Sequence, residues 1–68
     1  MEEFTRFEKT RLISARALQL SLGAPPMISV PKGASMIELA TFEFEQKKLP
    51  LTILRKYPNG EEKRISVS

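Results

Sequence analysis

The sequence has no cysteine, no histidine, no aspartate and no tryptophan among its 68 residues. Without cysteine, neither a disulfide nor a thiolate metal site can form. The common nucleophilic triads and most hydrolytic metal centres use histidine, cysteine or aspartate, so the sequence excludes them. Only scattered glutamates remain as metal ligands, and we therefore expect no metal, no cofactor and no catalytic residue.

Long apolar runs and glycine-rich loops are also missing. No apolar stretch approaches the roughly 20 residues that a membrane-spanning helix needs. The three glycines lie far apart, so they form no phosphate-binding loop. The acidic start, Met1-Glu2-Glu3, differs from the basic start of a signal peptide. We therefore expect a soluble, cytoplasmic protein.

The chain is short and mildly basic. It forms one domain at most, which we place at 1–68. A chain of this size buries only about 60% of its unfolded surface, so its own core is marginal. With disulfides and metals excluded, a protein partner is the remaining outside source of stability. The net charge of +3 suggests an acidic neighbour.

The stretch TRFEKTRLISARALQLSLGAPP is typical of one helix with both ends specified. Thr5 and Glu8 have the spacing of a capping box, in which each side chain accepts a backbone N–H of the other residue. Gly23 favours the left-handed conformation that closes a helix, and Pro25-Pro26 prevent its continuation. Phe4 is expected to pack under this helix.

The rest of the chain shows strand, helix and turn signals. Ile28 and Val30 alternate with a polar residue as in an edge strand. Ser35 and Glu38 repeat the capping-box spacing, and Pro58-Asn59-Gly60 is a turn between two strand patterns. We predict an α+β fold with two helices, a short edge strand between them and a C-terminal β-hairpin. The predicted segments are a tail at 1–4, a helix at 5–23, an extended segment at 27–30, a second helix at 35–48 and a hairpin at 50–68.

The first helix carries apolar residues on two sides. At about 100° per residue, Ile13, Ala17 and Leu20 form one stripe. A second stripe, with Arg11 inside it, consists of Phe7, Ala15, Leu18 and Leu22. One apolar stripe is the rule for a surface helix, and so short a chain is not expected to cover two. We therefore predict that a partner covers the stripe of Ile13, Ala17 and Leu20.

The role of two polar residues in the first helix is left open. Arg16 and Gln19 lie on a polar strip, where they either face solvent or hydrogen-bond a partner. Glu43 and Lys47, four residues apart in the second helix, are expected to form a surface pair.

Two functions besides a partner-dependent subunit remain open. The basic side chains of the first helix could contact phosphates, but they scatter over at least three sides and no aromatic platform accompanies them. This alternative is a small basic nucleic-acid-binding protein acting on its own. A self-associating structural module is the other.

Specific motifs follow one another along almost the whole chain. They are T-R-F-E-K from Thr5, R-x-x-x-x-R-A-L-Q-L from Arg11, G-A-P-P from Gly23, I-E-L-A from Ile37, L-P-L-T-I from Leu49 and the P-N-G turn. In this order they resemble archaeal RNA polymerase subunit K, which is related to a small subunit shared by the eukaryotic nuclear polymerases and to bacterial omega. The chain departs from that pattern at Ser35-Met36, where many relatives have Asp-Pro.

The resemblance implies a non-catalytic subunit of DNA-directed RNA polymerase, a nucleotidyltransferase complex. In the family this subunit docks on the largest subunit, latches that subunit's C-terminal region, and promotes assembly and stability. DNA is then contacted only through the complex. By similarity, the residues expected to line the partner interface are Arg11, Ser14, Arg16, Ala17, Gln19 and Leu20.

Overall fold

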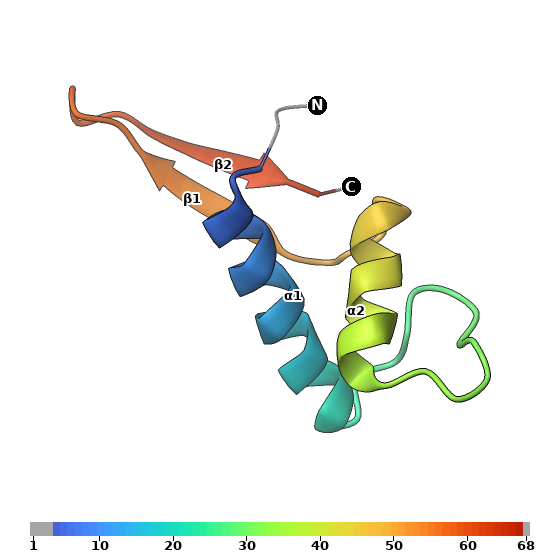
Figure 1. Ribbon diagram of the computed structural model, residues 1–68. Helices are drawn as coiled ribbons and strands as arrows, with labels where there is room; N and C mark the ends of the chain where they lie inside the picture. Colours follow the sequence, from blue (N-terminus) through green and yellow to red (C-terminus); the bar gives the residue numbers. More distant parts are fainter. Residues whose placement is uncertain (1–3, 68) are drawn as a thin grey trace.

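The structure is a computed structural model that describes residues 4–67. It contains α1 (Arg6–Ser21), α2 (Met36–Glu45), β1 (Thr52–Lys56) and β2 (Glu62–Ser66). Figure 1 shows α2 beside α1 and the hairpin of β1 and β2 extending away near the N-terminal end of α1. The principal dimensions of 46 × 22 × 18 Å reflect this projecting hairpin. The predicted α+β fold with two helices and a hairpin is confirmed, whereas the first three residues of the predicted tail lie outside the described residues.

The ends of α1 follow the signals in its sequence. The Thr5 hydroxyl accepts the Glu8 N–H at 3.1 Å, and the Glu8 carboxylate accepts the Thr5 N–H at 2.9 Å, which completes the capping box. At the other end, Gly23 has φ +102°. Its N–H donates to the Leu20 carbonyl, and the Ala24 N–H donates to the Gln19 carbonyl. This is the hydrogen-bond pattern of a Schellman motif, so glycine closes the helix as predicted.

The second helix begins as predicted and ends earlier. Ser35 and Glu38 form its capping box, but the helix stops at Glu45 instead of continuing to Lys48. Lys47 has φ +57°, the left-handed conformation that usually calls for glycine. This early turn directs Leu49 back into the core, where that side chain is fully buried. The prediction of a helix to residue 48 is therefore wrong by about one turn.

The segment at 27–30 is not a strand. The only sheet among residues 4–67 is the antiparallel pair of β1 and β2. Proline on both sides of the segment removes backbone donors that a sheet ladder needs. The Met27 N–H instead donates to the Glu43 carboxylate at 2.9 Å. The alternation of Ile28 and Val30 misled the prediction, because only Ile28 packs against the helices while Val30 is exposed.

The hairpin has the predicted turn. Ile53 pairs with Ile65 and Arg55 pairs with Lys63 in the antiparallel register. The Gly60 N–H donates to the Tyr57 carbonyl at 3.0 Å, and Gly60 adopts φ +89°. A tight turn followed by a left-handed glycine is a common way to join two antiparallel strands.

Two small apolar clusters hold these elements together. The first joins α1 to α2 through Ala17, Leu20, Leu39 and Ala40. The second joins α1 to the chain around the hairpin through Leu12, Leu49 and Val67, with Phe4 and Phe44 packed against it. The rings of Phe4 and Phe44 meet edge to face with centroids 5.7 Å apart, as expected for a Phe4 that packs under the helix.

As predicted, α1 has apolar residues on two sides. The stripe that this chain covers, however, is the one that was expected to bind a partner. Ala17 and Leu20 are each only 7% exposed because Leu39 and Ala40 of α2 pack on them, and Ile13 is half-buried. The prediction that the stripe of Ile13, Ala17 and Leu20 awaits a partner is therefore wrong. The prediction underestimated α2, whose buried Leu39 and Ala40 form one apolar cluster with Ala17 and Leu20.

Candidate docking surface

The structure divides the six predicted interface residues into two groups. Arg11, Ser14 and Gln19 are exposed on α1. The other three, Arg16, Ala17 and Leu20, are buried inside this chain. The six therefore do not form one accessible surface in the free chain.

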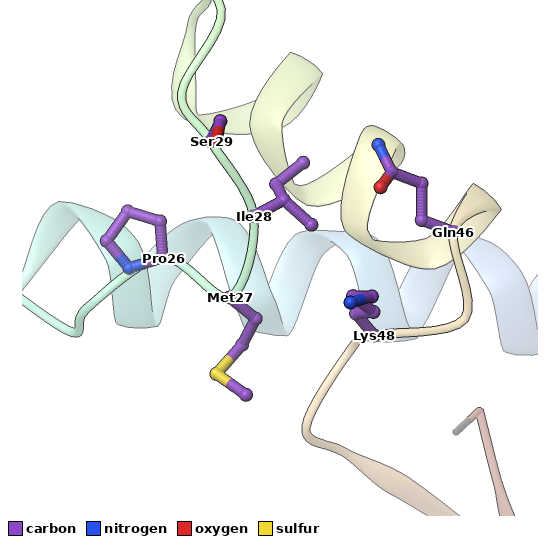
Figure 2. A pocket seen from close by; sticks show the side chains of 6 residues that line it. All are labelled: Pro26, Met27, Ile28, Ser29, Gln46 and Lys48. Carbon is purple, nitrogen blue, oxygen red and sulfur yellow. The ribbon is translucent and has the colours of Figure 1, made fainter.

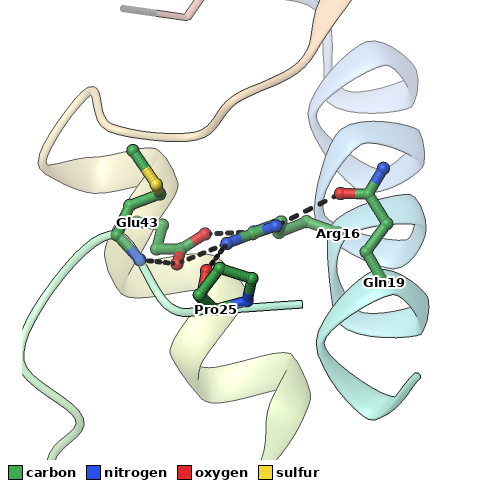
Figure 3. Close-up of polar contacts among 5 residues, drawn as sticks. Arg16, Gln19, Pro25 and Glu43 are labelled. Carbon is green, nitrogen blue, oxygen red and sulfur yellow. Dashed lines mark hydrogen bonds and ion pairs between the residues drawn. The ribbon is translucent and has the colours of Figure 1, made fainter. Parts of the chain in front are cut away.

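Arg16 is the centre of a buried polar cluster (Figure 3). Its guanidinium donates to both carboxylate oxygens of Glu43, from Nε at 2.6 Å and from a terminal nitrogen at 3.1 Å. It also donates to the Pro25 carbonyl at 2.9 Å and to the Gln19 side chain at 3.2 Å. The cluster thus links α1, the loop after it and α2. Among the described residues, no buried side-chain nitrogen or oxygen lacks a partner.

Glu43 remains ionised although it is fully buried. Burial by itself raises the pKa of this carboxyl, but the hydrogen bonds and charge of Arg16 and the Met27 N–H outweigh it. The net pKa of Glu43 lies below its ordinary value. The carboxylate therefore stays paired with the guanidinium at neutral pH.

Glu43 is the residue that the sequence analysis placed wrongly. It was expected to form a surface pair with Lys47, but Lys47 lies beyond the end of α2 and Glu43 points into the core. One signal for this was available. Leu39 and Ala40 precede Glu43 by four and three residues, so all three lie on one helix face, and that face is the buried one.

The side of α1 turned away from α2 is the main exposed apolar surface of the helix. Phe7 is 83% exposed, Leu18 is 61% exposed and Leu22 is 78% exposed. Arg11, Ser14 and Ala15 lie between them and are also exposed. We call these six residues the outer face of α1. Large apolar side chains gathered on one helix face are typical of protein–protein contact surfaces.

A shallow hollow adjoins the outer face. It has a volume of about 280 Å³ and is lined by Arg11 and Leu12 of α1 and by Thr52, Ile53 and Leu54 of the hairpin. Arg11 therefore faces a recess between helix and hairpin.

A larger depression lies around the loop after α1 (Figure 2). Its volume is about 550 Å³, and it is lined by Pro26, Met27, Ile28, Ser29, Gln46 and Lys48. Lys48 is its only ionisable lining residue, so the depression lacks a pair of groups for acid–base chemistry.

Two other kinds of feature are absent from residues 4–67. These residues hold no group of three or more side chains placed to bind a metal ion. In the same part of the chain, no helix is both long and apolar enough to cross a membrane.

The structure defines a small α+β domain that has a buried polar cluster and leaves one apolar face of α1 exposed to solvent. Comparison with known proteins identifies its family. Residues 4–51 match the model of the family described as RNA polymerase Rpb6. The DNA-directed RNA polymerase subunit Rpo6 of Pyrococcus furiosus is 53% identical over 55 residues, which cover 81% of this chain and 96% of the relative.

Other archaeal relatives carry the same description. The subunit Rpo6 of Thermoplasma volcanium is 48% identical over 54 residues, covering 78% of this chain and 88% of the relative. That of Sulfolobus acidocaldarius is 48% identical over 67 residues, covering 96% of this chain and 75% of the relative. The chain therefore belongs to the RNA polymerase Rpb6 family, a family of RNA polymerase subunits. The resemblance to archaeal subunit K is confirmed.

Proposed function

We propose that the chain is a non-catalytic subunit of DNA-directed RNA polymerase that docks on the largest subunit and promotes assembly and stability of the enzyme. The observation that carries this proposal is the family match over residues 4–51, which spans both helices and the loop between them. The archaeal relatives, described as subunits of this enzyme, support it. The subunit is expected to act in the cytoplasm.

The residue types of the chain favour a non-catalytic role. The sequence holds no histidine, cysteine or aspartate, and its fully buried glutamate is held in an ion pair with Arg16. A general base must be free to take a proton at the operating pH, and a paired carboxylate with a lowered pKa is unsuited to that task. The chemistry of the complex is therefore assigned to its other subunits.

The exposed apolar side chains of α1 support a role in assembly. The chain leaves the large apolar side chains of Phe7, Leu18 and Leu22 in water, so folding gains little from them and their burial against a partner favours the bound state. A partner that binds only the folded form stabilises it by mass action, and the same contact stabilises the partner's docking region. Mutual stabilisation of this kind promotes assembly without any catalytic group.

Native purification through a tag on the chain tests the proposal. We expect the largest subunit and the rest of the polymerase core to copurify at constant stoichiometry. Reconstitution of the polymerase without the chain should lower the yield of assembled enzyme, and adding the chain back should restore it. A tagged chain that stays apart from the polymerase would contradict the proposal.

The alternative of autonomous nucleic-acid binding is weakened by two ion pairs. Arg16 is buried against Glu43, and Arg55 is paired with Glu8, so neither guanidinium is available to phosphates. A salt titration of duplex DNA binding distinguishes the two functions. Tight binding by the free chain with a steep salt dependence would favour the alternative.

A further inference from the structure

The outer face of α1 has the spacing of a helix-packing seam. Phe7, Arg11, Ser14, Leu18 and Leu22 follow one another at intervals of four, three, four and four residues. Residues three and four apart lie one above the other on a helix, which is how one helix packs along another. The seam from Phe7 to Leu22 is about 22 Å long at about 1.5 Å per residue.

The middle of this seam is small and its ends are large. Ser14 and Ala15 lie at the centre, with Phe7 towards one end and Leu18 and Leu22 towards the other. Small residues allow two helix backbones to approach closely, and the cluster that joins α1 to α2 also contains two of them, Ala17 and Ala40. The shape of the outer face therefore fits a second helix better than a flat sheet or a broad loop.

Arg11 defines the chemistry of the occupant. It is the only charged residue of the outer face, and it borders the hollow of about 280 Å³ between α1 and β1. A guanidinium that is covered by a partner needs a carboxylate or carbonyl oxygens, because an unpaired buried charge is strongly destabilising. The backbone carbonyls of a helix are engaged in its own hydrogen bonds, so a helical occupant meets this need with an acidic side chain opposite Arg11.

A second copy of this chain does not meet that requirement. Parallel pairing of two outer faces would place Arg11 against Arg11, and antiparallel pairing about Ser14 and Ala15 would place it against Leu18. Within the described α1 the only acidic residue is Glu8, which is already hydrogen-bonded to Arg55. Self-association would thus leave the arginines buried without a counter-charge.

We propose that the outer face of α1 receives an amphipathic helix of another polymerase subunit, with apolar residues along the seam and a carboxylate opposite Arg11. The inference rests on the proposed function and specifies its contact. It replaces the buried Arg16, Ala17 and Leu20 by the exposed Phe7, Leu18 and Leu22 as the principal contact residues, and it retains Arg11 and Ser14.

Reconstitution of the polymerase with variant chains tests this contact. Leu18→Glu places a carboxylate in the apolar part of the seam, and we expect incorporation of this variant to require at least about tenfold more chain than that of the wild type. Ile37→Glu is the matched control, because Ile37 is 53% exposed on α2, and α2 packs against the opposite side of α1. Incorporation of the Arg11→Glu chain should fall below that of the wild type. The Arg11→Lys chain, which keeps the positive charge, should retain part of the wild-type incorporation.

A photo-crosslinking residue at position 18 then identifies the occupant in the assembled enzyme. We expect one crosslinked segment of another subunit, with apolar residues three and four apart and an acidic residue among them. Crosslinking to a second copy of the chain, or to a segment without that pattern, would overturn the inference. So would equal incorporation of the Leu18→Glu and Ile37→Glu chains. If the wild-type chain itself fails to incorporate, the proposed function fails instead, so the two failures are distinguishable.

Discussion

At the scale of single residues, the guanidinium of Arg16 joins α1 to α2 and to the loop between them. Removing one partner of a buried ion pair typically costs about 3–5 kcal/mol, because the other charge is left buried. We expect Arg16→Met to lower the free energy of unfolding of the purified chain by about this amount. Urea denaturation followed by circular dichroism measures it.

The double variant Arg16→Met, Glu43→Leu is the control for this prediction. Replacing both charges by apolar residues of similar volume is often neutral or stabilising. The double variant should therefore recover much of the loss, apart from the hydrogen bonds to Pro25 and Met27. A double variant as unstable as the single one would show that the ion pair is not the cause.

The lowered pKa of Glu43 predicts a dependence of stability on pH. The folded carboxyl binds its proton less tightly than the unfolded one, whose ordinary value is 4.5. Its contribution is therefore fully present above that value and is lost as the pH falls from it through the lower folded pKa. The difference in unfolding free energy between wild type and Glu43→Gln should shrink over this acidic range. Glu8 is present in both proteins, so its titration cancels, and a constant difference would contradict the prediction.

Lys47 offers a stabilising substitution. A left-handed conformation costs a non-glycine residue about 1–2 kcal/mol, and Lys47 adopts one at φ +57°. Lys47→Gly should raise the free energy of unfolding by about 1 kcal/mol, which thermal unfolding measures. Lys47→Ala keeps the Cβ atom and should give no comparable gain. Equal effects of the two substitutions would argue against strain at this position.

At the scale of secondary-structure elements, Glu8 has two roles. It completes the cap of α1, and its carboxylate also accepts from the Arg55 guanidinium of β1, which ties the hairpin to the helix. The Arg55 hydrogen bonds and the Thr5 N–H lower the pKa of Glu8, and the same pair raises the pKa of Arg55. The projecting hairpin therefore has a polar anchor in addition to its apolar one.

Glu8→Gln separates these roles, because glutamine also serves in a capping box. We expect the helix to remain, while the backbone amides of β1 exchange hydrogen faster than in the wild type. Glu38→Gln is the matched control, since Glu38 holds the same cap position in α2. Unchanged exchange in β1 of the Glu8→Gln chain would mean that the anchor contributes nothing.

Sequence signals predicted the elements with local causes and failed where tertiary contacts decide. Two capping boxes, the glycine end of α1 and the hairpin turn depend on residues close in sequence, and each formed as expected. The prediction of a strand at 27–30 was wrong because this segment has no neighbouring strand to pair with among residues 4–67. The predicted end of α2 was wrong because Leu49 is buried against Leu12 and Val67, which are distant from it in the sequence.

At the scale of the whole molecule, two apolar stripes on α1 correctly indicated more apolar surface than this chain covers. Periodicity alone cannot say which stripe α2 occupies, and the prediction chose the wrong one. The pairing of Arg16 with Glu43, 27 residues apart, was equally out of reach, because no local pattern links them. These two errors explain why three of the six expected interface residues, Arg16, Ala17 and Leu20, are buried within the chain.

The outer face of α1 is exposed in the free chain, and we expect the assembled polymerase to cover it. The chain has no cysteine, so a single Leu18→Cys substitution gives one thiol whose modification by a maleimide can be followed by mass spectrometry. We predict fast modification in the free chain and strong protection in the assembled enzyme, while Ile37→Cys reacts at similar rates in both. Equal reactivity of the thiol at position 18 in the free and assembled states would contradict the proposed contact.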